Sequence, residues 1–131
     1  MDQNLLDLML SVFNRHPDLR MAVVFGSLAA GRGHPDSDID LAVDAGRALS
    51  VAERMRLIGE VAEATGRPVD LIDLHVVGEP LLGQILKGGR RIFGSNAAYA
   101  ELIKRHVFAE ADFMPYQRRI LAERRRAWIG K

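Results

Sequence analysis

Residues 23–43 read VVFGSLAAGRGHPDSDIDLAV: an apolar run, a glycine-rich polar loop, and a segment in which aspartate alternates with apolar residues. The apolar run predicts a buried strand that ends at Gly26. The alternation predicts a second strand, because successive side chains of a strand point to opposite faces. Asp38 and Asp40 then share one face, whereas Ile39 and the apolar residues after it line the other.

On either side of these two strands, the chain shows helical and extended patterns. Apolar residues at helical spacing predict a helix at about residues 3–15. Ser50 followed by Glu53 matches a capping box, which begins a helix that Gly66 ends. The other predicted elements are a strand at about residues 67–74, a short helix at 80–89, a brief strand at 90–93 and a helical pattern from residue 96 onward, which Pro115 should kink or split.

This order of elements predicts an α/β or α+β fold, with a small mixed sheet flanked by helices. The length of 131 residues and the apolar content of 48% suit a single hydrophobic core. We expect one domain, with the core at residues 1–95 and a helical C-terminal extension at residues 96–131. The extension is a candidate partner interface.

The composition excludes several kinds of chemistry. The chain has no cysteine, which rules out disulfides, thiolate catalysis and cysteine-bound metals. Its 18 basic and 17 acidic residues give a net charge near zero, so no overall field favours nucleic acid or membranes. We find neither a basic amino-terminal signal nor an apolar run of membrane length, and we expect a cytoplasmic protein.

The aspartate pair has the chemistry of a cation site. Two residues apart on a strand, Asp38 and Asp40 have Cα atoms about 7 Å apart and side chains on one face. Mg²⁺ is commonly bound by one or two carboxylates together with waters and substrate phosphates. An isolated Asp-x-Asp motif is more often a pair of solvent-facing residues at the edge of a sheet. The surrounding residues are therefore needed to choose between the two interpretations.

The turn before this strand has the features of a phosphate-binding loop. Gly26 lets the backbone approach a ligand closely, and Ser27 offers a hydroxyl and an N–H group. Each residue alone would suit an ordinary turn. No Gly-Lys-Ser/Thr and no GxGxxG pattern follows the strand, so the two best-known nucleotide fingerprints are missing.

A third carboxylate comes from the strand predicted at residues 67–74. If that strand neighbours the strand of Asp40, at about 4.8 Å, Asp70 could reach the same site and act as a general base. Taken by itself, Asp70 could equally well be a loop carboxylate that has no functional role. Asp73 falls on the opposite face and is the second choice, with an exposed strand end as its alternative.

Together these residues resemble a known family. Gly26-Ser27, ten intervening residues and Asp38-Ile39-Asp40 are similar to the GSx10DxD signature of the nucleotidyltransferase superfamily related to DNA polymerase beta. The short chain, the segment RPVDLIDL and the later GGRRIF look most like minimal nucleotidyltransferases. The resemblance covers about residues 8–95.

The C-terminal part resembles, more loosely, the helical tail of minimal nucleotidyltransferases that are antitoxins. Those enzymes transfer AMP from ATP to a tyrosine of an RNase toxin with a HEPN domain, which silences the toxin. The resemblance therefore implies ATP as substrate, one or two Mg²⁺ ions and a hetero-oligomer with such a toxin. It implies phosphate contacts from Gly26, Ser27 and Ser37, Mg²⁺ ligation by Asp38 and Asp40, and Asp70 as the third carboxylate of the catalytic and metal site.

The sequence departs from the family pattern after the Gly-Ser pair. Many relatives have arginines where this chain has Leu28 and Ala30, and Arg32 is the nearest cation. Arg32 could bind a phosphate in their place, or it could be a solvated loop residue.

Six basic residues at 118–131 could contact RNA or an acidic partner, although a solvated helix face is at least as common.

Two other functions stay open at this stage. One is nucleotidyl transfer to a small molecule, as in aminoglycoside adenylylation, which the lack of a second domain disfavours. The other is a non-catalytic antitoxin that covers its toxin. Three converging carboxylates argue against pure binding, because an interaction surface has no need of them.

Overall fold

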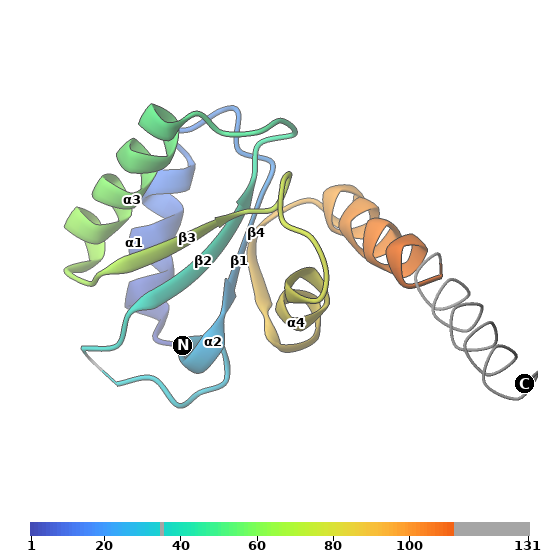
Figure 1. Ribbon diagram of the computed structural model, residues 1–131. Helices are drawn as coiled ribbons and strands as arrows, with labels where there is room; N and C mark the ends of the chain where they lie inside the picture. The colour runs from blue at the N-terminus through green and yellow to red at the C-terminus, as the bar shows by residue number, and fades with distance from the viewer. Residues whose placement is uncertain (35, 112–131) are drawn as a thin grey trace, which may run out of the picture.

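The computed structural model describes residues 1–34 and 36–111 (Figure 1). Its centre is a four-stranded sheet in the order β3-β2-β1-β4. The strands are β1 (Met21–Phe25), β2 (Ile39–Asp44), β3 (Val69–Asp73) and β4 (Arg90–Gly94). β1 is antiparallel to both β2 and β4, whereas β2 and β3 run parallel. The mixed sheet predicted from the sequence is confirmed.

Helices cover both faces of this sheet. They are α1 (Gln3–Phe13), α2 (Gly26–Ala29), α3 (Val51–Thr65) and α4 (Leu81–Gly88), followed by helical residues 96–111. Figure 1 shows α1 and α3 on one face, with α4 and the last helical segment on the other. None of the helices described is both long enough and apolar enough to cross a membrane.

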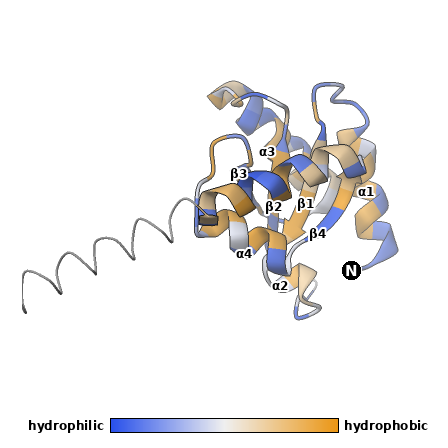
Figure 2. Ribbon diagram, turned by 90° about the vertical axis from the view of Figure 1, so that its right-hand side faces the viewer, coloured by the Kyte–Doolittle hydropathy of each residue, from blue (hydrophilic) through white to orange (hydrophobic). Residues whose placement is uncertain are grey.

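The alternation of side chains along β1 and β2 builds two cores. Val24 and Leu41 belong to the core under α1 and α3, whereas Val23 and Ala42 belong to the core under α4. Figure 2 shows apolar residues along the strands and on the helix faces that pack against them. Because both faces of β1 and β2 are covered, the register of these strands is held from two sides.

The helix boundaries follow local chemistry. Ser50 and Glu53 form the predicted capping box, and Gly66 ends α3 at a φ of 68°. At α1, the carboxylate of Asp2 accepts a hydrogen bond from the Asn4 N–H. α2 was not predicted, because four residues are too few to show a helical period; it occupies the first part of the loop expected after Gly26.

Asp73 is the clearest correction to the sequence-based interpretation. It is only 3% exposed, so the alternative of an exposed strand end is wrong. Its two carboxylate oxygens accept hydrogen bonds from the N–H groups of Leu49 (2.8 Å) and His75 (2.9 Å). Asp73 therefore ties the loop before α3 to the end of β3, far from the start of that strand where Asp70 lies.

We expect Asp73→Ala to lower the free energy of unfolding by about 3 kcal/mol, because it removes the charged acceptor of two partly buried hydrogen bonds. Urea denaturation measures this value. Asp7→Ala is the control, since Asp7 is exposed on α1 and should change stability by less than about 0.5 kcal/mol. An equal effect of the two substitutions would contradict the structural role of Asp73.

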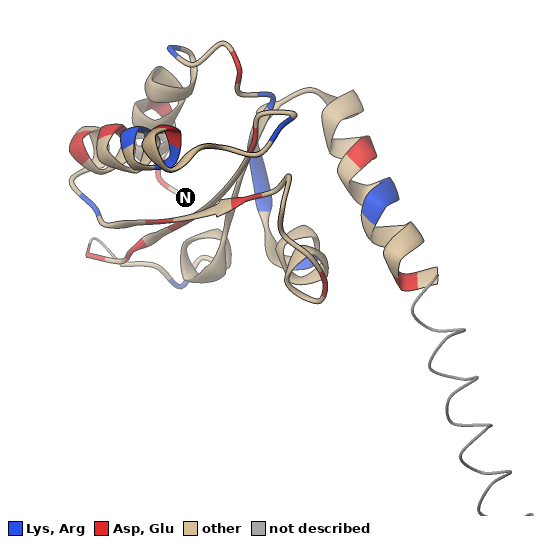
Figure 3. Cartoon of the chain, turned by 45° about the horizontal axis from the view of Figure 1, so that its top comes forward, with Lys and Arg blue, Asp and Glu red and all other residues tan. Residues whose placement is uncertain are grey.

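The start of the predicted C-terminal extension belongs to the core. Ala98 and Leu102 are buried against the face of the sheet that α4 covers. Residues 112–131 lie outside the described part, and so do the kink predicted at Pro115 and the basic cluster beyond it. Over the described residues, acidic and basic residues are interspersed along the chain (Figure 3).

Candidate active site

Parallel pairing of β2 and β3 brings two of the predicted carboxylates side by side. Asp40 and Asp70 are register partners in this pair. The next alternate residues, Ala42 and Ile72, both contact the core under α4, so the two aspartates share that face of the sheet. The sequence prediction for Asp70 depended on its strand being a neighbour of the strand of Asp40, and the structure confirms that pairing.

Asp38 joins this pair from just outside the sheet. It lies one residue before β2 and is exposed. Burial raises the pKa of Asp40 above its ordinary value, and the negative charges of Asp70 and Asp38 raise it further. The three carboxylates therefore form one electrostatic cluster, which a cation would stabilise.

The backbone at Gly26 closes directly onto this cluster. Gly26 has a φ of 72°, and a Cβ atom added there would lie 2.2 Å from Oδ2 of Asp40. Both the conformation and the contact disfavour a side chain. A side chain here could fit only by displacing the carboxylate of Asp40 from the space that it occupies.

Residues after Gly26 fold the chain into a tight turn. The Ala30 N–H donates to the Gly26 carbonyl (3.1 Å), and the Arg32 N–H donates to the Ser27 carbonyl (2.9 Å). Ser27 follows Gly26 in α2, so it lies at the end of the sheet where the aspartates are. It is exposed, as a phosphate contact requires. The Arg32 side chain is exposed, and phosphate binding by it stays a prediction.

Ser37 has a partner inside its own loop. Its hydroxyl accepts a hydrogen bond from the His34 N–H (2.8 Å), and its own N–H donates to the His34 carbonyl (2.9 Å). The hydroxyl proton is still available as a donor. The Ser37 hydroxyl therefore already stabilises the loop, and its predicted phosphate contact would be a second interaction of the same group.

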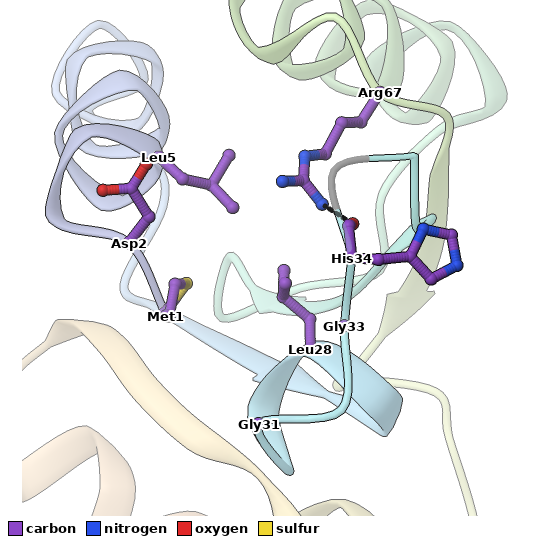
Figure 4. Close-up of a pocket in the computed structure, with 8 residues that line it drawn as sticks. All are labelled: Met1, Asp2, Leu5, Leu28, Gly31, Gly33, His34 and Arg67. Atoms are coloured by element: carbon purple, nitrogen blue, oxygen red, sulfur yellow. Dashed lines mark hydrogen bonds between the residues drawn. The ribbon is translucent and has the colours of Figure 1, made fainter.

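A cavity of about 330 Å³ lies on the other side of this loop (Figure 4). Its floor includes Leu5 and Leu28, which belong to the core under α1 and α3, and its rim includes His34 and Arg67. Figure 4 shows the Arg67 side chain reaching from the end of α3 toward the loop. Arg67 was not predicted from the sequence, because a single arginine after a helix-ending glycine has no distinctive pattern.

Among the residues described, no three Asp, Glu or His side chains stand close enough together to hold a metal ion by themselves. The donor set nevertheless suits Mg²⁺, which prefers oxygen ligands and commonly combines one or two carboxylates with waters and phosphate oxygens. Burial and, after it, the negative charges of Asp70 and Asp38 raise the pKa of Asp40, and a bound cation would stabilise its ionised form. Asp38 and Asp40 are the residues that would hold such an ion.

The fold and the site together define a small mixed sheet with three aspartates gathered at one end, beside a Gly-Ser turn. Residues 9–98 match the family model described as polymerase beta, nucleotidyltransferase. The chain belongs to this nucleotidyltransferase family. The matched range agrees closely with the 8–95 expected from the Gly-Ser and aspartate motifs.

A curated relative is the protein adenylyltransferase MntA of Shewanella oneidensis. It is 35% identical over 79 residues, which are 60% of this chain and 57% of MntA. The aligned part thus spans a little over half the length of that relative.

Solved structures show the same fold over most of the chain. A crystal structure of a toxin-antitoxin with AMP-PNP contains a chain that is 24% identical, with a TM-score of 0.76 over 90% of this chain and 96% of that one. The structure of the tri-AMPylated Shewanella oneidensis HEPN toxin in complex with MNT antitoxin contains another. It is 22% identical, with a TM-score of 0.73 over 94% of this chain and 98% of that one.

Proposed function

We propose that the protein is a Mg²⁺-dependent nucleotidyltransferase that acts as an antitoxin. It transfers AMP from ATP to a tyrosine of a cognate HEPN-domain RNase toxin and so inactivates the toxin. The observation that carries this proposal is the cluster of Asp38, Asp40 and Asp70 closed against Gly26. The relative named as a protein adenylyltransferase and the fold shared with toxin-antitoxin complexes support the choice of substrate.

Each residue of the site has a distinct task in this reaction. Asp38 and Asp40 hold the magnesium ion, which when bound offsets negative charge on the ATP phosphates and on the departing pyrophosphate. Gly26 has no side chain, so its backbone lies directly against the carboxylate of Asp40, where its N–H group is a candidate phosphate contact. Ser27 donates its hydroxyl hydrogen to a phosphate oxygen, with Ser37 and Arg32 as further candidate contacts.

Asp70 supplies the base. Its carboxylate is exposed and lies beside Asp40, so an acceptor hydroxyl can approach it from solvent. As the tyrosine oxygen forms its bond to the α-phosphorus, the bond from that phosphorus to the bridging oxygen breaks and pyrophosphate leaves. The phenolic proton passes to Asp70, which completes the balance of the step. Asp70 could also contribute to metal binding.

Exposed apolar side chains support a protein acceptor. Ile103, Val107 and Phe108 on the last helical segment are 44%, 52% and 56% exposed. Figure 1 shows this segment extending away from the sheet. Large apolar side chains gathered on one exposed helix are typical of a partner interface.

With ATP and an RNase toxin as substrates, the protein acts in the cytoplasm.

The test is to purify the protein together with a helical HEPN-type protein encoded beside it, and to incubate both with Mg²⁺ and α-labelled ATP. We expect label and the mass of AMP on the partner, and neither with EDTA nor with Asp38→Asn. Intact mass spectrometry gives the number of groups transferred. Label on an added aminoglycoside alone would favour a small-molecule acceptor, and a stable complex without transfer would leave binding as the only function.

A further inference from the structure

We propose that Arg67 is a positioning residue that holds Asp38 in place for cation binding. This inference rests on the proposed function, because it assumes that Asp38 is a magnesium ligand. It concerns a residue with no place in the Gly-Ser and aspartate motifs. The three carboxylates are held in different ways.

Asp40 and Asp70 are held by the sheet, but Asp38 is not. Asp40 and Asp70 are register partners within β2 and β3, and the pairing of these strands begins at Ile39 and Val69. Asp38 precedes this ladder and is exposed. An exposed residue before the first strand pair would sample several backbone conformations unless other contacts restrain it.

Such contacts come from residues 67 and 68. Nη1 of Arg67 donates to the His34 carbonyl (3.0 Å) and to the Ser37 carbonyl (3.3 Å). The Ile39 N–H donates to the Pro68 carbonyl (2.9 Å). The peptide groups on both sides of Asp38 are thus tied to the same short segment, and Figure 4 shows the bond from Arg67 to His34.

Arg67 is itself well placed to act as this restraint. It follows Gly66, the residue that ends α3, and its N–H donates to the Thr65 hydroxyl (3.3 Å). β3 begins two residues after Arg67 and carries Asp70. The guanidinium therefore ties the loop that carries Asp38 to the segment that leads into the strand of Asp70.

The arginine side chain suits this task better than lysine would. The guanidinium is planar and its donors are fixed in a fork, so that two carbonyl groups can be held at a defined angle. A lysine ammonium is a more mobile point charge on a flexible stem. We therefore expect Arg67→Lys to restore only part of the function that Arg67→Ala removes.

The consequence is a selective effect on cation affinity. Loss of a residue that orients a metal ligand typically weakens metal binding about 10- to 100-fold. We expect Arg67→Ala to weaken binding of Mn²⁺, used as the probe in the absence of ATP, by about tenfold or more. The Mg²⁺ concentration for half-maximal AMP transfer should rise by a similar factor, whereas kcat at saturating Mg²⁺ should change less.

A matched control is available in the same structure. Arg105 also donates to two backbone carbonyls, those of Leu74 and Val77, but at the opposite end of β3. Arg105→Ala removes the same kind of bonds without touching the loop of Asp38. Both alanine variants should lose comparable stability in urea, and only Arg67→Ala should lose Mn²⁺ affinity in electron paramagnetic resonance titrations. If Arg67→Ala does not fold, Arg67→Lys is titrated in its place, with a smaller but measurable loss expected.

The outcomes separate this inference from the proposed function. Wild-type protein that neither binds Mn²⁺ nor transfers AMP overturns the proposed function and this inference with it. Wild-type protein that does both, with unchanged Mn²⁺ affinity in the Arg67 variants, overturns the role of Arg67 alone. An equal loss of affinity in Arg105→Ala also overturns it, because the effect would then follow from general destabilisation.

Discussion

Asp40→Asn should abolish AMP transfer and at the same time raise the melting temperature of the protein at pH 7. Transfer should fall by at least about 1,000-fold, because a bound cation supplies several kcal/mol of charge stabilisation and each 1.36 kcal/mol is a factor of ten in rate. Asparagine keeps the size of the side chain, so that the contact with Gly26 is preserved. Incorporation of labelled AMP into the partner measures the first effect.

The gain in stability follows from the pKa of Asp40. This pKa is raised in the folded protein, first by burial and then by the charges of Asp70 and Asp38. The folded state therefore binds the proton more tightly than the unfolded chain, and stability is lost as the pH rises from the ordinary pKa of 3.8 through the raised value. Thermal melts of wild type and Asp40→Asn should differ at pH 7 and converge below about pH 3.8.

Asp44→Asn is the matched control for this experiment. Asp44 ends the same strand, and its carboxylate accepts a hydrogen bond from the Gly46 N–H. Its replacement should leave transfer unchanged and should not raise the melting temperature. Addition of Mg²⁺ should stabilise the wild type but not Asp40→Asn. Normal transfer by Asp40→Asn would contradict the site, and a lower melting temperature at pH 7 would contradict the electrostatic argument.

Gly26→Ala should reduce transfer by about 100-fold or more, because the added Cβ would displace the carboxylate of Asp40, and a shift of about 1 Å at a catalytic group can cost a factor of this size. A Cβ at this position lies only 2.2 Å from Oδ2 of Asp40. The positive φ of 72° adds backbone strain of about 1–3 kcal/mol. The measurement is transfer at saturating ATP, together with stability in urea.

Gly31→Ala separates the two causes. Gly31 has a φ of 74°, close to that of Gly26, but nothing lies within 4 Å of an added Cβ. Both variants should therefore lose similar stability from backbone strain, whereas only Gly26→Ala should lose most of its transfer activity. Equal activities of the two variants would show that the approach of Gly26 to Asp40 has no catalytic importance.

Local patterns explain which parts of this fold were predictable. The capping box of Ser50 and Glu53 and the ending at Gly66 act within a few residues, and the structure has both as expected. The alternation around Asp38 and Asp40 likewise needs only the period of a strand. α2 escaped prediction because its four residues give no periodic signal, and because its Gly-Ser start also suits a simple turn.

The roles of Asp70 and Asp73 show where local reasoning ends. Both belong to the same predicted strand, and parity alone assigns them to opposite faces. The parallel register with β2 places Asp70 beside Asp40, and the loop before α3 folds over Asp73 and buries it. Neither event can be read from residues 67–74 alone, because each depends on a segment more than twenty residues away.

Two features follow from the sequence alone: the spacing of the Gly-Ser pair from the two aspartates, and the family to which these residues belong. The contact of Gly26 with Asp40 and the hydrogen bonds from Arg67 to the loop of Asp38 arise only when the chain folds. The physical reason is that strand periodicity and helix capping are short-range effects. Strand register, burial and close approach instead arise when distant segments pack on both faces of one sheet.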